Sequence, residues 1–162
     1  MTETLTKTPT AAGIPASTLN RVLDEGYGPG AWYGADLRTA TEGETAAVAF
    51  VRPAASRHNV AEIALHHAYW ATQIAAKLTG EAPAKFPLDG EDWFELNDES
   101  RLSWSKVRST LAAAQARLSK AVAAKSSPLS ETERFDIAIG ITGHAAYHAG
   151  QIQLVKVLVA GK

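Results

Sequence analysis

The chain has 162 residues, of which 46% are hydrophobic and 20% are charged, so it can bury the core of one domain. Its net charge of -1 at pH 7 and its scattered charged residues give no basic face for a phosphate backbone, which argues against nucleic-acid binding. Because the sequence contains no cysteine, it excludes disulfides, thiolate ligands and a cysteine nucleophile, and a metal ion would need histidine, carboxylate or water ligands.

The N-terminal residues 1–15 are polar and lack the apolar run of a secretory signal. No later segment is long and apolar enough to cross a bilayer, so we expect no membrane partner. We therefore expect a flexible N-terminus over residues 1–15, a single domain over residues 16–162, and a cytoplasmic protein.

The first predicted helix begins near Pro15 and ends at the glycines between Gly26 and Gly30. The residues that follow, 31–58, contain glycine, proline and threonine at positions that interrupt any helical period. We expect a long connection there with only short helical pieces.

Two further helices are predicted in the middle of the chain. The first covers Val60–Thr79, because Asn59 and Glu62 have the spacing of a capping box and no helix-breaking residue occurs before Gly80. A loop rich in proline and acidic residues separates it from the next helix. That helix is indicated by apolar residues at spacings of three and four, namely Trp104, Val107, Leu111, Ala114, Leu118 and Val122.

The last helix is predicted to begin at the capping-box pair Ser130 and Glu133, after the stop signal at Pro128, and to reach about Ala160. Four amphipathic helices without a strand pattern predict an all-α fold, a four-helix bundle with long loops between the helices. In such bundles, ligand and metal sites are built from side chains of facing helices.

Histidines are the candidate functional residues. His144 and His148 are four residues apart and share one face of the last helix with an apolar stripe, which fits either a metal site or two core histidines. A metal site would need a third ligand, and the second long helix offers His66 and His67, which point about 100° apart. The apolar stripe of that helix is centred nearer His67, so periodicity favours His67 over His66.

Two segments resemble the DinB-like and YfiT-like superfamily of four-helix-bundle metalloenzymes. They are "HNVAEIALHHAYW" at residues 58–70 and "GHAAYHAGQIQLVK" at residues 143–156, and "AWYG" near Trp32 and "DWFEL" at residues 92–96 also fit. The likeness covers the chain from about Ser17 onward. It departs from the superfamily at one position, because many relatives have a histidine where this chain has Tyr33.

The resemblance implies that His66, His144 and His148 are the ligands of a divalent metal ion, and so chooses His66 against the stripe argument. Nitrogen ligands suit zinc, nickel or iron, and an open coordination position would serve catalysis. The better understood relatives act with low-molecular-weight thiols, which makes such a thiol a second expected cofactor. Gln151 and Tyr147 are expected beside the ligands, where they could bind substrate or metal-bound water.

We therefore predict a metal-dependent enzyme, a hydrolase or a thiol S-transferase, in which the metal activates water or the thiol against a small-molecule substrate. The alternative is a non-catalytic metal-binding or stress-response helical bundle. Bundles of this kind often pair through helix faces, so a homodimer is a further expectation.

Overall fold

The computed structural model describes residues 13–160, and these residues form helices and no strand. The helices are, in chain order, α1 (Ala16–Tyr27), α2 (Leu37–Thr41), α3 (Ala46–Ala49), α4 (Val60–Thr79), α5 (Trp104–Ala123) and α6 (Glu131–Val159). The predicted all-α class is confirmed, and the short α2 and α3 are the helical pieces expected between the first two long helices. Residues 1–12 of the expected flexible N-terminus lie outside the described part of the chain.

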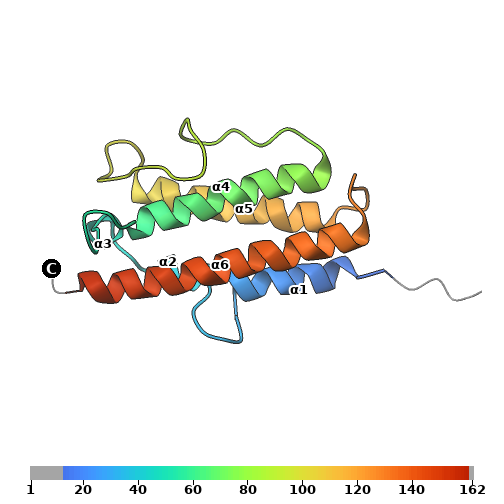
Figure 1. Cartoon of the computed structure of the whole chain (residues 1–162), viewed down its shortest axis with the longest axis horizontal. Coiled ribbons are helices and arrows are strands. Elements are labelled where there is room, and N and C mark those ends of the chain that lie inside the picture. Colours follow the sequence, from blue (N-terminus) through green and yellow to red (C-terminus); the bar gives the residue numbers. More distant parts are fainter. Residues whose placement is uncertain (1–12, 161–162) are drawn as a thin grey trace, which may run out of the picture.

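The four long helices lie side by side along the length of the molecule (Figure 1). α4 packs mainly against α5, and α1 packs mainly against α6. α4 also contacts α6, and α1 also contacts α5, so the two pairs face each other. This arrangement brings α4 and α6 together although a long loop and α5 separate them in the sequence.

The predicted capping boxes define where the two functional helices begin. At α4 the Asn59 side chain accepts a hydrogen bond from the Glu62 amide, and the Glu62 carboxylate accepts one from the Asn59 amide. Ser130 and Glu133 form the same reciprocal pair at the start of α6. α4 ends at Gly80, whose φ of 75° is the left-handed conformation that glycine adopts without strain.

α1 approaches α6 closely at Gly26. A Cβ atom on this glycine would lie 2.7 Å from the Thr142 carbonyl oxygen and 2.8 Å from the Ala145 Cβ, closer than real side chains pack. A larger residue would push the two helices apart. Gly26 therefore lets α1 support α6 beside His144, the residue that precedes Ala145.

The loop of residues 80–103 is anchored to the start of α4. Asn59 Nδ2 donates to the Leu96 carbonyl over 2.6 Å, and the Leu96 amide donates to Glu62 Oε1 over 2.8 Å. The Arg52 guanidinium binds both oxygens of the Glu62 carboxylate, which is 1% exposed. These bonds hold the middle of the loop over the N-terminal half of α4.

The core lies between the long helices and contains every member of the apolar stripe predicted for α5. These side chains are all buried: Trp104, Val107, Leu111, Ala114, Leu118 and Val122. Among the helices of the described region, none is both long enough and apolar enough to span a membrane.

Candidate metal centre

α4 and α6 bring three histidines together between them. His144 Nε2 lies 3.1 Å from His66 Nε2 and 3.2 Å from His148 Nε2. One ring nitrogen from each of the three residues lies within 4.8 Å of the others. Nitrogens about 2.0–2.1 Å from a zinc ion at tetrahedral angles are about 3.3 Å apart, so this group could hold one metal ion.

His67, which periodicity favoured, lies outside this group. It is 1% exposed, and its Nδ1 lies 2.9 Å from His144 Nδ1. Its other ring nitrogen, Nε2, is buried with no hydrogen-bond partner within residues 13–160. The apolar stripe thus marked the most deeply buried histidine of α4, whereas the adjacent His66 is the one whose Nε2 reaches α6.

Each of the three histidines has a neighbour at its Nδ1 atom. His66 Nδ1 lies 3.0 Å from the Asp92 carbonyl oxygen, and His148 Nδ1 lies 2.7 Å from Gln151 Oε1. Both partners can only accept a hydrogen bond, so both Nδ1 atoms carry the ring proton. In the neutral rings, His66 Nε2 and His148 Nε2 therefore present lone pairs.

These two lone pairs both face His144 Nε2. A neutral His144 has one proton, so Nε2 can donate to His66 or to His148 but not to both. At least one of the two short contacts is thus not a hydrogen bond, and it leaves a buried lone pair without a donor, an arrangement that is unfavourable without a cation. If His144 carries its proton on Nδ1, that proton points at His67 Nδ1, and all three Nε2 lone pairs converge.

The environment keeps these rings neutral. Burial, followed by the nearby His66, lowers the pKa of His144 to about 4, and burial together with His144 lowers the pKa of His148 to about 4. Burial also lowers the pKa of His66 and, more strongly, that of His67. Neutral imidazole is the form that binds metal, so at pH 7 no proton competes for these donors.

Asp92 and Trp93, in the loop between α4 and α5, cover the histidines. Asp92 has a φ of 63°, which is uncommon for a residue with a side chain, and both its carbonyl oxygen and its Oδ1 lie within 3.1 Å of His66 Nδ1. The same Oδ1 accepts a hydrogen bond from Trp70 Nε1 over 2.7 Å. The Trp93 ring stacks on the His66 ring with centroids 3.9 Å apart.

Gln151 and Tyr147 lie next to His148. Gln151 Oε1 accepts the His148 Nδ1 proton, and Gln151 Nε2 donates to the Tyr147 hydroxyl over 2.9 Å. Tyr147 is mostly exposed. Tyr33, in contrast, is exposed, and its charged neighbours are Asp36 and Glu25 rather than the histidines.

His58 and Glu62, at the start of α4, belong to the structure that supports the centre. His58 Nδ1 lies 3.0 Å from Glu62 Oε2, and the His58 ring stacks on Trp93 with centroids 3.7 Å apart. Trp93 is thus held between His58 and His66. Glu62 forms the predicted capping box and also binds Arg52.

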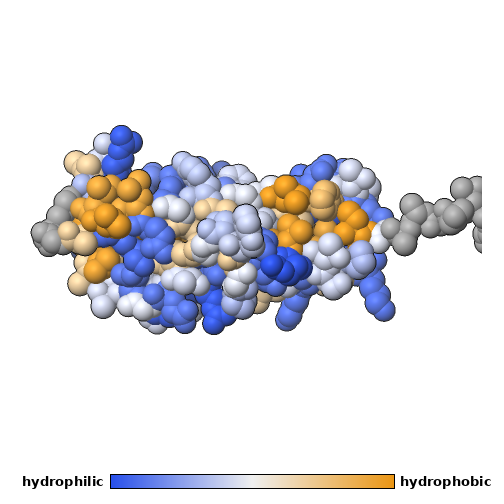
Figure 2. All heavy atoms as spheres, turned by 90° about the horizontal axis from the view of Figure 1, so that it is seen from below, coloured by the Kyte–Doolittle hydropathy of each residue, from blue (hydrophilic) through white to orange (hydrophobic). Residues whose placement is uncertain are grey.

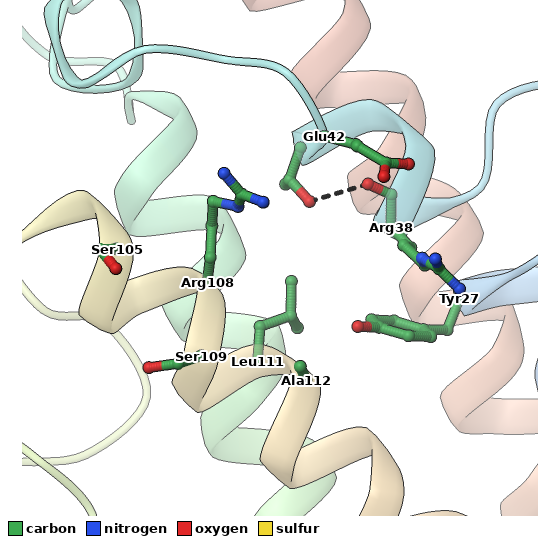
Figure 3. Close-up of a pocket in the computed structure, with 9 residues that line it drawn as sticks. Tyr27, Arg38, Glu42, Ser105, Arg108, Ser109, Leu111 and Ala112 are labelled. Carbon is green, nitrogen blue, oxygen red and sulfur yellow. Dashed lines mark hydrogen bonds between the residues drawn. The ribbon is translucent and has the colours of Figure 1, made fainter.

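A separate cleft between α5 and the α1–α2 region contains none of the histidines. It has a volume of about 420 Å³, and Figure 3 shows Arg38 and Arg108 on opposite sides of it, with Tyr27 and Leu111 nearby. Glu42 places a carboxylate at the same cleft. No metal-ligand group among the described residues occurs there.

Comparisons of the chain with protein-family models, with curated proteins and with solved structures give no match. The likeness of residues 58–70 and 143–156 to the DinB-like superfamily therefore remains a prediction from those two segments. The geometry of the three histidines stands independently of it.

Proposed function

We propose that His66, His144 and His148 bind one divalent cation, and that the protein is a metal-dependent enzyme that activates water or a low-molecular-weight thiol. The observation that carries the proposal is the convergence of three Nε2 atoms whose opposite Nδ1 atoms all have hydrogen-bond partners. Such partners fix the tautomer and the ring orientation of metal-binding histidines.

The donor set favours zinc, nickel or iron over magnesium or calcium, because all three ligands are imidazole nitrogens. Three protein ligands leave at least one coordination position open for water or substrate, as in catalytic zinc sites. When bound there, the cation supplies a Lewis acid that lowers the pKa of a coordinated water or thiol.

The surrounding residues would orient the ligands and limit water access. The Asp92 carbonyl and Gln151 Oε1 accept the ring protons of His66 and His148, so neither ring can turn its Nε2 away without losing a hydrogen bond. Trp93 covers one face of His66 and meets the His148 ring edge-on at 6.1 Å between centroids. A ligand entering the centre would meet this indole.

The likeness of residues 58–70 and 143–156 to the DinB-like superfamily supports the same proposed function. For the fold, we propose a four-helix bundle of the DinB-like arrangement, formed by α1, α4, α5 and α6. For the reaction, we propose a hydrolase or a thiol S-transferase with a small-molecule substrate. A homodimer and a cytoplasmic location are part of the same proposal.

Activity screening of the metal-loaded protein tests this function. The untagged chain, loaded with zinc, nickel or iron, would be assayed for ester and amide hydrolysis and for conjugation of low-molecular-weight thiols to electrophiles. We expect turnover that is lost on chelation, restored by the metal, and absent from His148→Ala. The rival function, a non-catalytic metal-binding bundle, predicts no turnover in any assay and unfolding when the metal is removed.

A further inference from the structure

A second pocket adjoins the metal centre at the junction of α4 and α6. Its volume is about 450 Å³, within the range of small-ligand sites. Gln151 connects the pocket to the metal centre, because it lines the pocket and also accepts a hydrogen bond from His148 Nδ1. His58 lines the pocket too, and its ring stacks on Trp93, which also stacks on His66.

One end of this pocket is polar and basic. Arg57 and His58 line it, and none of the lining residues is acidic. The Arg57 guanidinium makes no hydrogen bond or ion pair with any described residue, although the backbone of Arg57 bonds to Ala54 and Arg52. The Glu62 carboxylate binds the Arg52 guanidinium and lies 3.0 Å from His58 Nδ1. The uncompensated charge at this end is therefore that of Arg57.

The other end of the pocket is apolar. Ile63 and Val155 are buried in the wall of the pocket, whereas Leu154 and Leu158 are 59% and 51% exposed. Figure 2 shows hydrophobic residues exposed at the end of the molecule where α6 finishes. Contiguous apolar patches on a protein surface mark interaction sites or ligand-binding grooves.

From this juxtaposition we propose that the pocket binds a small organic acid, with its carboxylate at Arg57 and His58 and its hydrocarbon body on Leu154 and Leu158. The assignment of this acid as substrate rests on the proposed function, because Gln151 then lies between the acid and the metal centre. Guanidinium groups bind carboxylates with two parallel hydrogen bonds, so Arg57 is the residue on which binding depends most.

The test is a calorimetric titration of the full chain with three probes of one shape, phenylacetate, phenylacetamide and phenethylammonium. Phenylacetate should bind, and the neutral and cationic probes should bind at least about tenfold more weakly, because each lacks the charge that Arg57 recognises. Arg57→Gln should weaken phenylacetate binding by about tenfold or more. Leu154→Ala should weaken phenylacetate binding while leaving acetate binding unchanged.

Arg108→Gln is the matched control, since Arg108 is also an exposed arginine whose side chain makes no hydrogen bond or ion pair within residues 13–160, but it lines the separate cleft of Figure 3. It should change phenylacetate binding by less than about twofold. The proposal is overturned if phenylacetamide binds as tightly as phenylacetate, if Arg57→Gln and Arg108→Gln have equal effects, or if phenylacetate does not bind at millimolar concentration.

Metal content measured on the same samples separates this inference from the proposed function. Arg57-dependent binding of phenylacetate to protein that takes up no metal supports the acid pocket and overturns the metal centre alone. Stoichiometric metal in protein that does not bind phenylacetate overturns the acid pocket alone.

Discussion

The three histidines of the centre are oriented by three different kinds of neighbour. His66 uses a backbone carbonyl, that of Asp92, His148 uses the side-chain amide of Gln151, and His144 faces another imidazole, that of His67. A backbone carbonyl persists through any side-chain substitution, whereas the amide and the imidazole can be removed. The contributions of Gln151 and His67 to metal binding can therefore be measured separately by substitution.

The first prediction concerns the adjacent histidines of α4. His66→Ala should abolish stoichiometric metal binding, because it removes one of three ligands. His67→Ala should keep one metal per chain and weaken its affinity by about 10- to 100-fold, since it removes only a neighbour of His144. Equilibrium dialysis with zinc measures both. Full loading of His66→Ala together with loss of metal from His67→Ala would show that the ligand assignment is wrong.

The second prediction concerns Gln151. Gln151→Leu should leave one metal per chain and lower its affinity by about tenfold, because His148 loses the acceptor that fixes its tautomer. Tyr147→Phe is the control, since it removes only the hydroxyl that the Gln151 amide donates to, and it should change the affinity by less than about twofold. An equal effect of both substitutions in competitive zinc titrations would contradict the role given to Gln151.

At the scale of elements, the start of α4 connects the centre to the fold. Glu62 closes the capping box, binds Arg52 and accepts the Leu96 amide, so one buried carboxylate links α4 to two connecting segments. The Leu96 bond holds the loop that carries Asp92 and Trp93 over His66.

Glu62→Gln should lower the free energy of unfolding by about 3 kcal/mol, because it leaves the Arg52 charge without its buried partner. The matched control is Glu133→Gln, which changes the same position of the exposed capping box of α6 and should cost much less, because glutamine can also close a capping box and no buried charge loses its partner. Guanidinium chloride unfolding at neutral pH measures both values. Equal losses would contradict the linking role of Glu62.

The elements were largely predictable, because their signals are local. The capping boxes at Asn59 and Ser130 and the period of the α5 stripe place the long helices without tertiary information. The covering segment was not predictable in this way. The contact of Asp92 with His66 depends on a positive φ and on loop closure over 26 residues, and neither leaves a periodic pattern.

The choice between His66 and His67 also lay beyond periodicity. The spacing of apolar residues along a helix indicates which side of the helix is buried, and in α4 it correctly predicted that His67 is in the interior. Which nitrogen reaches another helix depends on the relative position of α4 and α6, where Gly26 of α1 supports α6. Only the resemblance to a known family favoured His66 before the structure did.

At the scale of the whole molecule, the metal-free protein should lose stability in acid. The folded-state pKa values of His144 and His148 are about 4, below the usual value of about 6.5 in an unfolded chain. Between these values the unfolded chain binds more protons, so stability is complete above about pH 6.5 and falls as the pH drops toward 4. The double variant His144→Gln, His148→Gln should show a smaller fall in unfolding midpoint over this range. A fall equal to that of the wild type would contradict the depressed pKa values.

Burial of apolar residues, rather than the metal centre, supplies most of the stability of the fold. The core of leucines and alanines between the long helices is continuous without any contribution from the histidines. Removal of a bound metal should therefore lower the melting temperature by mass action and leave the helical content at room temperature unchanged.

Metal analysis of the protein purified without a polyhistidine tag tests the central claim most directly. The three converging Nε2 atoms predict one equivalent of zinc, nickel or iron per chain, either as purified or after addition of the ion and removal of the excess. Absence of stoichiometric metal after addition of zinc, nickel and iron in turn would contradict the proposed centre and the metal-dependent function built on it.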